Sequence, residues 1–248
     1  MSKLTGKVAV VTGASKGIGA AIAKAFAAEG AAVVVNYASS REGADKVVAG
    51  ITASGGKALA VGGSVTRAAD VEKLFAETRN AFGPADILVN NAGVYNLQPL
   101  ENVTEEDYRR QFDTNVLGLL LASKAAAAQF GPEGGSIINI SSLVSRITPP
   151  GSVVYTGTKA AVDGITRVLA KELGPRKIRV NAVNPGLTET EGTRTVGIIG
   201  SDFEKGAVQG TPLGRIGRPD DIADVAVFLA SDQSRWLTGE TVFASGGA

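Results

Sequence analysis

The stretch Val8-Ala9-Val10-Val11-Thr12-Gly13-Ala14-Ser15-Lys16-Gly17-Ile18-Gly19 decides the fold of this chain. A short apolar run leads directly into a glycine-rich turn, and a helical pattern follows from about Gly17 to Glu29. Gly13 permits the tight turn, Gly17 lets the backbone approach a pyrophosphate, and Gly19 allows close packing of the helix, whose free amides attract an anion. The stretch therefore predicts the strand, phosphate-binding loop and helix of a dinucleotide-binding fold.

The same alternation of strand and helix continues along the chain. Short apolar, β-branched runs fall at 32–35, 58–61, 87–89, 137–140, 178–183 and 241–244, and helical stretches at 41–54, 68–82, 105–129, 153–173 and 219–230. Strands that are apolar throughout and separated by helices are typical of a parallel sheet covered on both faces. We therefore predict a doubly wound α/β (Rossmann) sheet of about seven strands, with helices on both faces, in a single domain spanning 1–248.

The composition limits the chemistry. The 248 residues are 44% hydrophobic, carry a formal net charge of +1 and include no cysteine and no histidine. Interspersed charges give no broad footprint for nucleic acid or an anionic membrane. Thiolate catalysis, histidine-based triads and the usual transition-metal ligands are excluded, so we expect no metal site. With no signal-peptide pattern and no membrane-spanning apolar stretch, we expect a soluble, cytoplasmic protein.

One segment, 188–217, interrupts the alternation. It follows a strand end, where α/β sheets bind their ligands, and it lacks strong periodicity. It is also rich in glycine, with Gly192, Gly197, Gly200, Gly206 and Gly210. These features favour a mobile substrate lid and an ordinary long surface connection about equally.

Tyr155 and Lys159 lie four residues apart in the predicted helix 153–173, so both side chains fall on one face. A phenol with a pKa of about 10 is a poor acid or base at neutral pH, and a neighbouring cation lowers that pKa. The pair predicts a tyrosine acid or base activated by lysine. By spacing alone, an ordinary helix surface is the favoured interpretation of the pair, and only the rest of the chain can reverse it.

The end of the second predicted strand bears on the choice of cofactor. A site for NAD(H) generally has an acidic side chain there, and a site for NADP(H) has a cation for the extra phosphate. Here the strand ends Asn36-Tyr37-Ala38-Ser39-Ser40-Arg41, without an acid, and Lys16 lies inside the glycine loop. We therefore predict that NADP(H) is preferred, with NAD(H) as the alternative.

These features follow one another in the order typical of one family. The order is the glycine loop, Asn90-Asn91-Ala92-Gly93, Asn115, Ser142, Tyr155, Lys159 and Pro185-Gly186, with Ser142 preceding Tyr155 by 13 positions (155 − 142). The chain thus resembles the short-chain dehydrogenase/reductases, including 3-oxoacyl-reductase-like and glucose-dehydrogenase-like members. The resemblance implies that Ser142 holds a substrate carbonyl and Tyr155 protonates it. It further implies that Lys159 lowers the tyrosine pKa and holds the nicotinamide ribose, while Asn115 anchors a water that relays protons to lysine.

The resemblance also completes the expected dinucleotide site. It implies contacts to the adenosine at the ends of the third and fourth strands, and to the nicotinamide in the segment after Pro185, where Thr190 ranks above Thr188. The predicted cofactor-binding residues are Gly13, Ser15, Lys16, Gly17, Ile18, Gly19, Asn36, Tyr37, Arg41, Ser64, Val65, Asn91, Ala92, Gly93, Tyr155, Lys159, Pro185, Gly186, Thr188 and Thr190. Ser64 is a departure, because the family often has aspartate there to hold the adenine amino group, so the Val65 backbone is the expected substitute.

The leading hypothesis is NADPH-dependent reduction of a ketone or aldehyde with Tyr155 as general acid. Alternatives are a sugar or polyol dehydrogenase and a 3-oxoacyl-carrier-protein reductase. The second is less favoured, because 129–135 lacks the basic cluster that is usual in family members acting on carrier protein. A non-catalytic dinucleotide sensor is a different class. The resemblance and the alanine-rich helices predict a homo-oligomer, a tetramer in the family. The expected pocket is mainly apolar, with Tyr95, Leu97, Val144, Ile147, Pro149, Val153, Leu187 and Val196.

Overall fold

The computed structural model describes residues 2–248, and a parallel sheet runs through its centre. Within these residues seven strands pair in the order β3-β2-β1-β4-β5-β6-β7, every pair parallel. The strands are β1 (Val8–Val11), β2 (Ala32–Tyr37), β3 (Lys57–Gly62), β4 (Ile87–Asn90), β5 (Gly135–Ile140), β6 (Ile178–Pro185) and β7 (Thr241–Ala244). The order reverses between β1 and β4, and ligands of such sheets bind beyond the carboxyl ends at this point.

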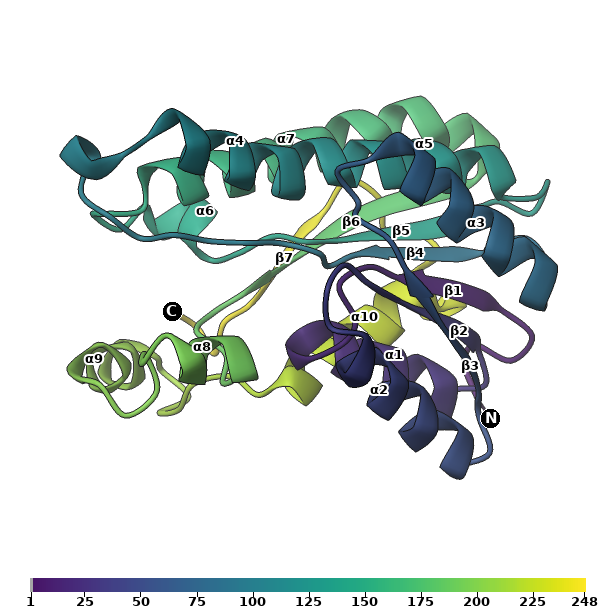
Figure 1. Cartoon of the computed structure of the whole chain (residues 1–248), viewed down its shortest axis with the longest axis horizontal. Coiled ribbons are helices and arrows are strands. Elements are labelled where there is room, and N and C mark those ends of the chain that lie inside the picture. The colour runs from purple at the N-terminus through teal and green to yellow at the C-terminus, as the bar shows by residue number, and fades with distance from the viewer. Residues whose placement is uncertain (1) are drawn as a thin grey trace.

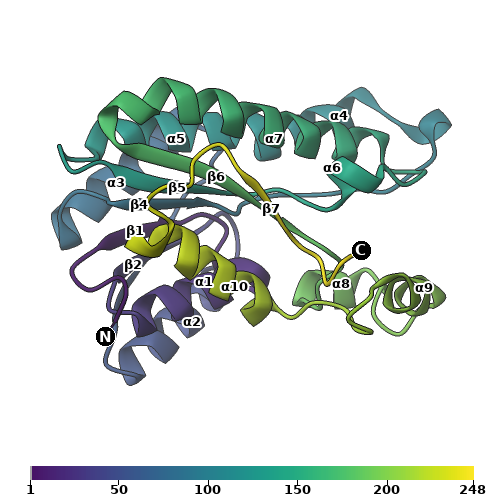
Figure 2. The same ribbon diagram turned by 180° about the vertical axis from the view of Figure 1, so that it is seen from behind.

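Helices cover both faces of the sheet (Figures 1 and 2). One layer holds α1 (Gly17–Ala28), α2 (Arg41–Ala53) and α10 (Pro219–Ala230), and the other holds α3 (Ala68–Phe82), α4 (Glu105–Phe112), α5 (Gly118–Gln129) and α7 (Val153–Leu173). Successive strand residues point to opposite faces, so Val11 joins the core under α1 and α10, and Val10 joins the core under α3 and α5. The predicted doubly wound fold is confirmed.

Two segments differ from the sequence expectation. The expected single helix 105–129 is divided by a π-helical turn, Asp113–Leu117, between α4 and α5. The glycine-rich segment 188–217 contains two helices, α8 (Glu191–Thr195) and α9 (Asp202–Gly210), because Thr190 and Ser201 cap their first turns. The remaining short elements are α6 (Val144–Ile147) and the 3₁₀ turns Leu100–Asn102, Gly174–Arg176 and Asp232–Ser234.

The segment 188–217 is closed at its base. Thr188 and Gly217 form an isolated parallel bridge, in which the Gly217 amide donates to Leu187 at 2.8 Å and the Glu189 amide donates to Gly217 at 2.9 Å. Farther out, the Leu213 amide donates to the carbonyl of Gly246, so the C-terminal residues lie beside this segment (Figure 2). Across residues 2–248, no helix combines the length and apolar character needed to span a membrane.

Candidate active site

The glycine loop leaves no room for larger residues. Gly13 and Gly17 have φ angles of 60° and 58°, which glycine adopts without strain. A Cβ atom on Gly13 would lie 2.8 Å from the Cα atom of Ala92, and one on Gly19 would lie 2.3 Å from the amide nitrogen of Asn91. The loop is therefore packed against the chain that follows β4, with its backbone exposed to a ligand at the start of α1.

Thr12 and Asn91 hold this loop in place. The Thr12 hydroxyl accepts hydrogen bonds from the backbone amides of Asn91 and Ala92, both at 3.0 Å. The Asn91 side-chain amide donates to the carbonyls of Thr12 at 2.9 Å and Gly13 at 3.0 Å. Both side chains thus hold the loop in its conformation. This role of Thr12 could not be predicted from the sequence, because its hydrogen-bond partners lie 77 or more residues away in the chain.

The two residues at the end of β2 differ in their surroundings. Asn36 is buried, accepts a hydrogen bond from the Gly13 amide, and donates to the carbonyls of Val61 and Gly63. Its side chain thus links the glycine loop to β3, and both its oxygen and its nitrogen are already hydrogen-bonded. Tyr37 stays partly exposed and lies over Gly62, where an added Cβ would be 3.0 Å from the phenol oxygen.

The two candidate cations lie at one corner of the sheet. Lys16 is the exposed residue that precedes α1, and Arg41 begins α2. The start of α2 packs on the glycine loop, since a Cβ on Gly43 would lie 2.7 Å from the Ser15 carbonyl. Arg41 is 80% exposed and its contact with Asp45 spans 3.6 Å, so this ion pair is weak and the guanidinium is available to a phosphate.

The expected adenine region follows β3. The Ser64 amide donates to Asp70 at 2.7 Å, and the Ser64 hydroxyl lies 2.9 Å from that of Thr66. The backbone bond to Ser64 and the ion pair with Arg67 lower the pKa of Asp70. Val65 is buried against Gly118, where an added Cβ would lie 2.6 Å from its methyl group. Asp70 thus fixes the turn that carries Ser64 and Val65.

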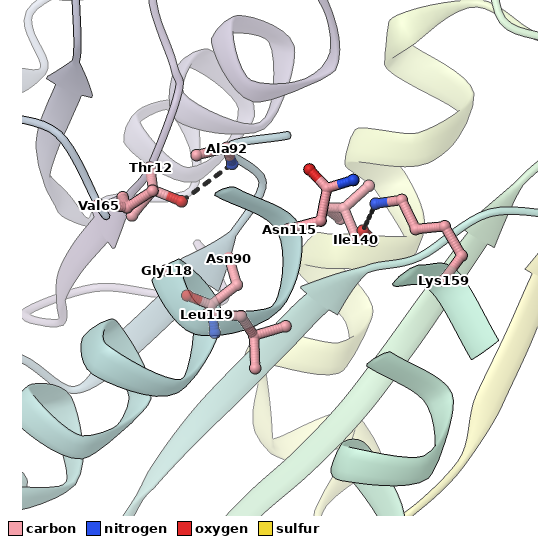
Figure 3. A pocket seen from close by; sticks show the side chains of 9 residues that line it. All are labelled: Thr12, Val65, Asn90, Ala92, Asn115, Gly118, Leu119, Ile140 and Lys159. Atoms are coloured by element: carbon pink, nitrogen blue, oxygen red, sulfur yellow. Dashed lines mark hydrogen bonds between the residues drawn. The ribbon is translucent and has the colours of Figure 1, made fainter. Parts of the chain in front are cut away.

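Tyr155, Ser142 and Lys159 converge at the carboxyl ends of β5 and β6. The Ser142 hydroxyl lies close enough to the Tyr155 phenol to lower its pKa. Lys159 is buried, and its Nζ donates to the Ile140 carbonyl at 2.8 Å and lies 5.7 Å from the centre of the Tyr155 ring (Figure 3). The structure therefore brings together Tyr155 and Lys159, whose spacing predicted acid–base chemistry, and Ser142, whose role the family resemblance implied.

The pKa values differ from the simplest expectation for this pair. Burial raises the pKa of Tyr155 to about 12; the hydrogen bond with Ser142 opposes the shift, and Tyr95 adds to it. Burial lowers the pKa of Lys159 to about 8, with Asp163 opposing. In this structure burial is the largest cause of the shift in the Tyr155 pKa, and the Lys159 ammonium points to the Ile140 carbonyl. The lowering of the tyrosine pKa by Lys159 stays a prediction.

Asn115 lies in the π-helical turn and is buried. Its side chain pairs with Val94, accepting from the backbone amide and donating to the carbonyl, both at 2.8 Å, and it also donates to Thr158 at 3.0 Å. A Cβ on Gly93 would lie 3.3 Å from the Asn115 oxygen and 3.8 Å from Lys159 Nζ. An alanine at position 93 would thus pack tightly against the Asn115 oxygen, where asparagine and lysine approach each other.

A small cavity lies among these groups. Its volume is about 10 Å³, near the minimum for one water molecule. Figure 3 shows Asn115 and Lys159 on one side and Thr12 and Asn90 on the other. The complete lining is Thr12, Val65, Asn90, Ala92, Asn115, Gly118, Leu119, Ile140 and Lys159.

The expected nicotinamide segment connects β6 to segment 188–217, the predicted lid. Pro185 ends β6 and is buried, and a Cβ on Gly186 would lie 3.0 Å from the Cα of Ser245. Thr188 is buried with its hydroxyl on the Gly186 carbonyl. Thr190 begins α8 and lies over Gly17, with a methyl group 3.4 Å from the position of an added Cβ.

Three polar residues near the site escaped sequence reasoning. Asn184 on β6 donates to both carboxylate oxygens of buried Asp163 and to the Ser142 carbonyl, which connects α7 to the loop after β5. Glu191 accepts a hydrogen bond from the Gly17 amide at 2.9 Å. The spacing of Asp163 four residues after Lys159 was a usable signal, whereas the other two contacts are long-range.

Most of the expected apolar pocket residues are not buried, and Tyr95 is the one in ring contact with Tyr155 among the described residues. Tyr95 packs on Tyr155, with ring centres 5.8 Å apart and a tilt of 54°. The others are partly or largely exposed rather than buried in a core: Leu97, Ile147, Val153 and Val196 are about half-exposed, and Val144, Pro149 and Leu187 are intermediate.

The glycine cradle and the serine, tyrosine and lysine cluster together define a dinucleotide-dependent oxidoreductase. A family model described as enoyl-(acyl carrier protein) reductase matches residues 13–248. An uncharacterized oxidoreductase of Methylorubrum extorquens is 63% identical over 247 residues, covering 100% of this chain and 99% of that protein. A 3-oxoacyl-[acyl-carrier-protein] reductase of Synechocystis is 41% identical over 249 residues, with coverage of 100% and 98%.

A solved structure is also similar to this chain. A short-chain dehydrogenase from Burkholderia cenocepacia in complex with NADP superposes with a TM-score of 0.93 at 38% identity, covering 99% of this chain and 98% of that one. The chain belongs to the short-chain dehydrogenase/reductase family and is an NAD(P)-dependent oxidoreductase. The family resemblance predicted from the sequence is confirmed.

Proposed function

We propose that this protein reduces a ketone or aldehyde to an alcohol with NADPH, reversibly, and that Tyr155 is the general acid. The observation that carries the proposal is the convergence of the Ser142 hydroxyl, the Tyr155 phenol and buried Lys159 beside a water-sized cavity. A sensor that only bound a dinucleotide would gain nothing from burying a lysine and a phenol together, since burial disfavours their charged forms.

The residues of this chain fit a dinucleotide. Gly13 and Gly19 form a cradle that a Cβ would fill, and the start of α1 presents the Gly17 amide to an anion. When bound, the nicotinamide supplies the hydride. We assign the 2′-phosphate to Lys16 and Arg41, the ribose of the nicotinamide half to Tyr155 and Lys159, and its carboxamide to the segment from Pro185 to Thr190.

Each of these side chains has its own role in the proton transfer. Negative charge develops on the carbonyl oxygen during reduction, so Ser142 donates a hydrogen bond to that oxygen and Tyr155 delivers its proton there. At neutral pH the phenol, with a pKa of about 12, is fully protonated and ready to donate. Lys159 and a water in the cavity beside Asn115 restore the tyrosine proton.

The decisive variant is Tyr155→Phe, which removes the proton donor and keeps the ring. We expect kcat for ketone reduction to fall by about 10³-fold or more, while NADPH binding, measured by fluorescence, changes by less than about threefold. Tyr108→Phe, on the exposed surface of α4, is the matched control and should reduce ketones normally. Turnover by Tyr155→Phe near that of the wild type would refute the proposal.

Two other substrates deserve direct comparison. A 3-oxoacyl group on carrier protein is suggested by the Synechocystis relative, but Arg109 and Arg110 on α4 pair with Glu105 and Asp107 and offer little free charge to an acidic carrier. Glucose oxidation represents the sugar dehydrogenases. Steady-state rates with a β-keto ester, an acyl-carrier substrate and glucose, each with NADPH/NADP⁺ and NADH/NAD⁺, rank the three activities.

We also propose a homo-oligomer, with a tetramer as the family resemblance implies. Large apolar side chains are exposed along the outer helical layer, among them Leu117, Leu120 and Val168, and α4, α5 and α7 lie side by side there (Figure 1). Exposed apolar faces of this kind favour association. Sedimentation velocity showing a monomer at micromolar concentration would contradict this assignment. The cytoplasmic location stays a prediction.

A further inference from the structure

Lys159 and Asp163 are the two buried charged side chains among residues 2–248, and they lie one turn apart on α7. Burying a charge is costly unless the group is paired or hydrogen-bonded. The Lys159 ammonium is bound to the Ile140 carbonyl and takes part in the proton transfer proposed above. The Asp163 carboxylate has no part in that proton transfer, and among the described residues it accepts hydrogen bonds from the side chain of Asn184 alone.

The Asn184 side chain joins Asp163 to the loop that carries Ser142. It is fully buried on β6, and its amide nitrogen lies 3.2 and 3.1 Å from the two carboxylate oxygens of Asp163. The same nitrogen lies 3.2 Å from the Ser142 carbonyl oxygen and 3.1 Å from the Ser145 hydroxyl. The carboxylate of α7 and the loop after β5 therefore share one donor group.

The carboxylate decides which way the Asn184 amide faces. Carboxylate and carbonyl oxygens only accept hydrogen bonds, so the side of the amide that faces Asp163 and Ser142 must be its NH₂ group. If the amide were turned by 180°, its oxygen would meet acceptors on both sides. In the structure that oxygen is buried without a hydrogen-bond partner, so the amide is oriented by what its nitrogen binds.

This amide completes the attachment of the loop at Ser142. The backbone amides of Ser141 and Leu143, on either side of Ser142, donate to carbonyls of β6 at 2.8 and 2.9 Å. Between them, the Ser142 carbonyl is bound by the Asn184 side chain. The backbone of the residue that is to hold the substrate carbonyl is thus fixed by a group whose orientation depends on Asp163.

Asp163 also acts on Lys159 through its charge. The other groups that face the ammonium carry no charge at neutral pH: the Tyr155 ring on α7, the Ile140 carbonyl on β5 and the Asn115 side chain in the π-helical turn. Burial lowers the pKa of Lys159 to about 8, and the negative charge of Asp163 opposes that shift. The carboxylate therefore extends the pH range in which Lys159 holds its proton.

Resting on the reductase function proposed above, we propose that Asp163 is a positioning residue of the catalytic centre. Its carboxylate orients the Asn184 amide that holds the Ser142 backbone, and its charge favours the ammonium form of Lys159. One buried acid thereby connects the residue that holds the substrate carbonyl with the residue that restores the tyrosine proton.

Asp163→Asn keeps the shape of the side chain and removes its charge. Because restoring the tyrosine proton needs the Lys159 ammonium, kcat for reduction of ethyl acetoacetate by the wild type should fall as the pH rises through about 8. In the variant this alkaline limb should lie about one pH unit lower, since a favourable neighbouring charge is lost. NADPH binding at pH 6, measured by fluorescence, should change by less than about threefold.

The same variant tests the hold on Ser142 at pH 6, where Lys159 is charged in both proteins. An amide at position 163 can donate to the oxygen of Asn184, so the Asn184 amide is free to turn away from the Ser142 carbonyl. We expect kcat at pH 6 to be about tenfold lower than in the wild type, the effect of about one hydrogen bond.

The exchange variant Asp163→Asn/Asn184→Asp separates this positioning from packing. Its amide and its carboxylate can again hydrogen-bond each other, so its melting temperature should be higher than that of Asn184→Asp, in which two carboxylates meet. A carboxylate at position 184 has no proton for the Ser142 carbonyl. The exchange should therefore restore stability and leave kcat about tenfold low.

Recovery of kcat together with the melting temperature in the exchange variant would show a role in packing alone and overturn the proposal. An alkaline limb of Asp163→Asn at the wild-type pH would overturn it as well, and in both cases the reductase function stands. A wild type that reduces no ketone with NADPH removes the reductase function and the positioning role together. The control is Asp224→Asn, an exposed acid on α10, which should match the wild type in kcat and in its pH profile.

Discussion

The Glu191 carboxylate of the lid accepts a hydrogen bond from the backbone amide of Gly17 at 2.9 Å, across 174 residues of sequence. Gly17 begins α1, where unpaired amides and the helix dipole favour an anion. The pyrophosphate of a dinucleotide needs the same position. Because one amide cannot serve both anions, the lid and the cofactor compete for the start of α1.

Glu191→Gln should therefore tighten NADPH binding. Replacing a carboxylate by a neutral amide weakens the contact with Gly17 by about 1 kcal/mol, which corresponds to a Kd about fivefold lower. Isothermal titration of NADPH measures the change. Binding of 2′-AMP, which has no pyrophosphate, should be unaltered.

Glu189→Gln is the control for this variant. It removes an equal charge from the same segment, but Glu189 pairs with Arg194 and does not touch the glycine loop. Equal tightening by both variants would point to a general electrostatic effect of the lid and would contradict competition at Gly17.

Lys159→Met should inactivate the enzyme and stabilise it at pH 7. Burial lowers the pKa of Lys159 from 10.5 to about 8, so the folded protein binds this proton less tightly than the unfolded chain. Holding the ammonium thus costs stability in full below pH 8, and the cost fades between about pH 8 and 10.5. The shift is worth up to about 3 kcal/mol, and losing the bond to Ile140 returns about 1 kcal/mol of it.

Urea unfolding of the wild type and of Lys159→Met at pH 7 and pH 10 measures this difference. We expect the variant to be more stable by about 2 kcal/mol at pH 7, with a smaller gap at pH 10. A variant that is less stable at pH 7, or a gap that does not vary with pH, would show that the buried ammonium carries no net cost.

Ser142→Ala should move the pH profile of alcohol oxidation to higher pH. In that direction the phenolate of Tyr155 accepts the proton, and the hydrogen bond with Ser142 lowers the pKa that burial raises. Without the serine, fewer molecules carry the phenolate at a given pH, and the loss of the carbonyl contact lowers kcat by about 10²-fold.

Profiles of kcat against pH from 7 to 11 test this shift. Ser141→Ala is the adjacent control, because the Ser141 hydroxyl donates to the carbonyl of Lys159 and not to the phenol. If the limb moves with Ser141→Ala and not with Ser142→Ala, the assignment of the catalytic serine is one position out.

The double variant Lys16→Ala/Arg41→Ala should lose the preference for NADPH that we propose. Both cations are exposed at one corner of the glycine loop, so each contributes about 1 kcal/mol or more to a bound 2′-phosphate. We expect kcat/KM with NADPH to fall about 30-fold or more while that with NADH changes by less than threefold. Lys46→Ala on the outer part of α2 is the control.

Much of this fold follows from local patterns. The strand, glycine turn and helix around Gly13 are formed by residues that are close together in the sequence. The parallel order follows because helices connect consecutive apolar strands. Likewise Tyr155 and Lys159 share a helix face by spacing alone. Ser142 lies in the loop after β5, and only the family resemblance connected it to Tyr155 and Lys159.

The rest depends on contacts that spacing does not encode. The i,i+4 relation placed Lys159 beside Tyr155 but did not reveal that its ammonium turns to Ile140. Asn36 is predicted only as a cofactor-binding residue, and the sequence does not reveal that its side-chain amide joins the glycine loop to β3. By contrast, α9 could have been predicted, because Ser201 and Glu204 have the spacing of a capping box. The glycines of this segment obscured that signal.

The bridge between Thr188 and Gly217 has a consequence for how far the segment between them can vary. The Gly217 amide donates to the Leu187 carbonyl and the Glu189 amide donates to the Gly217 carbonyl, so the two ends are held together whatever the length of chain between them. Because the entropic cost of closing a loop grows slowly with its length, insertions or deletions between α8 and α9 should cost little stability. A change within α8 is different, because Thr190 and Glu191 contact Gly17 and would alter the surroundings of the glycine loop.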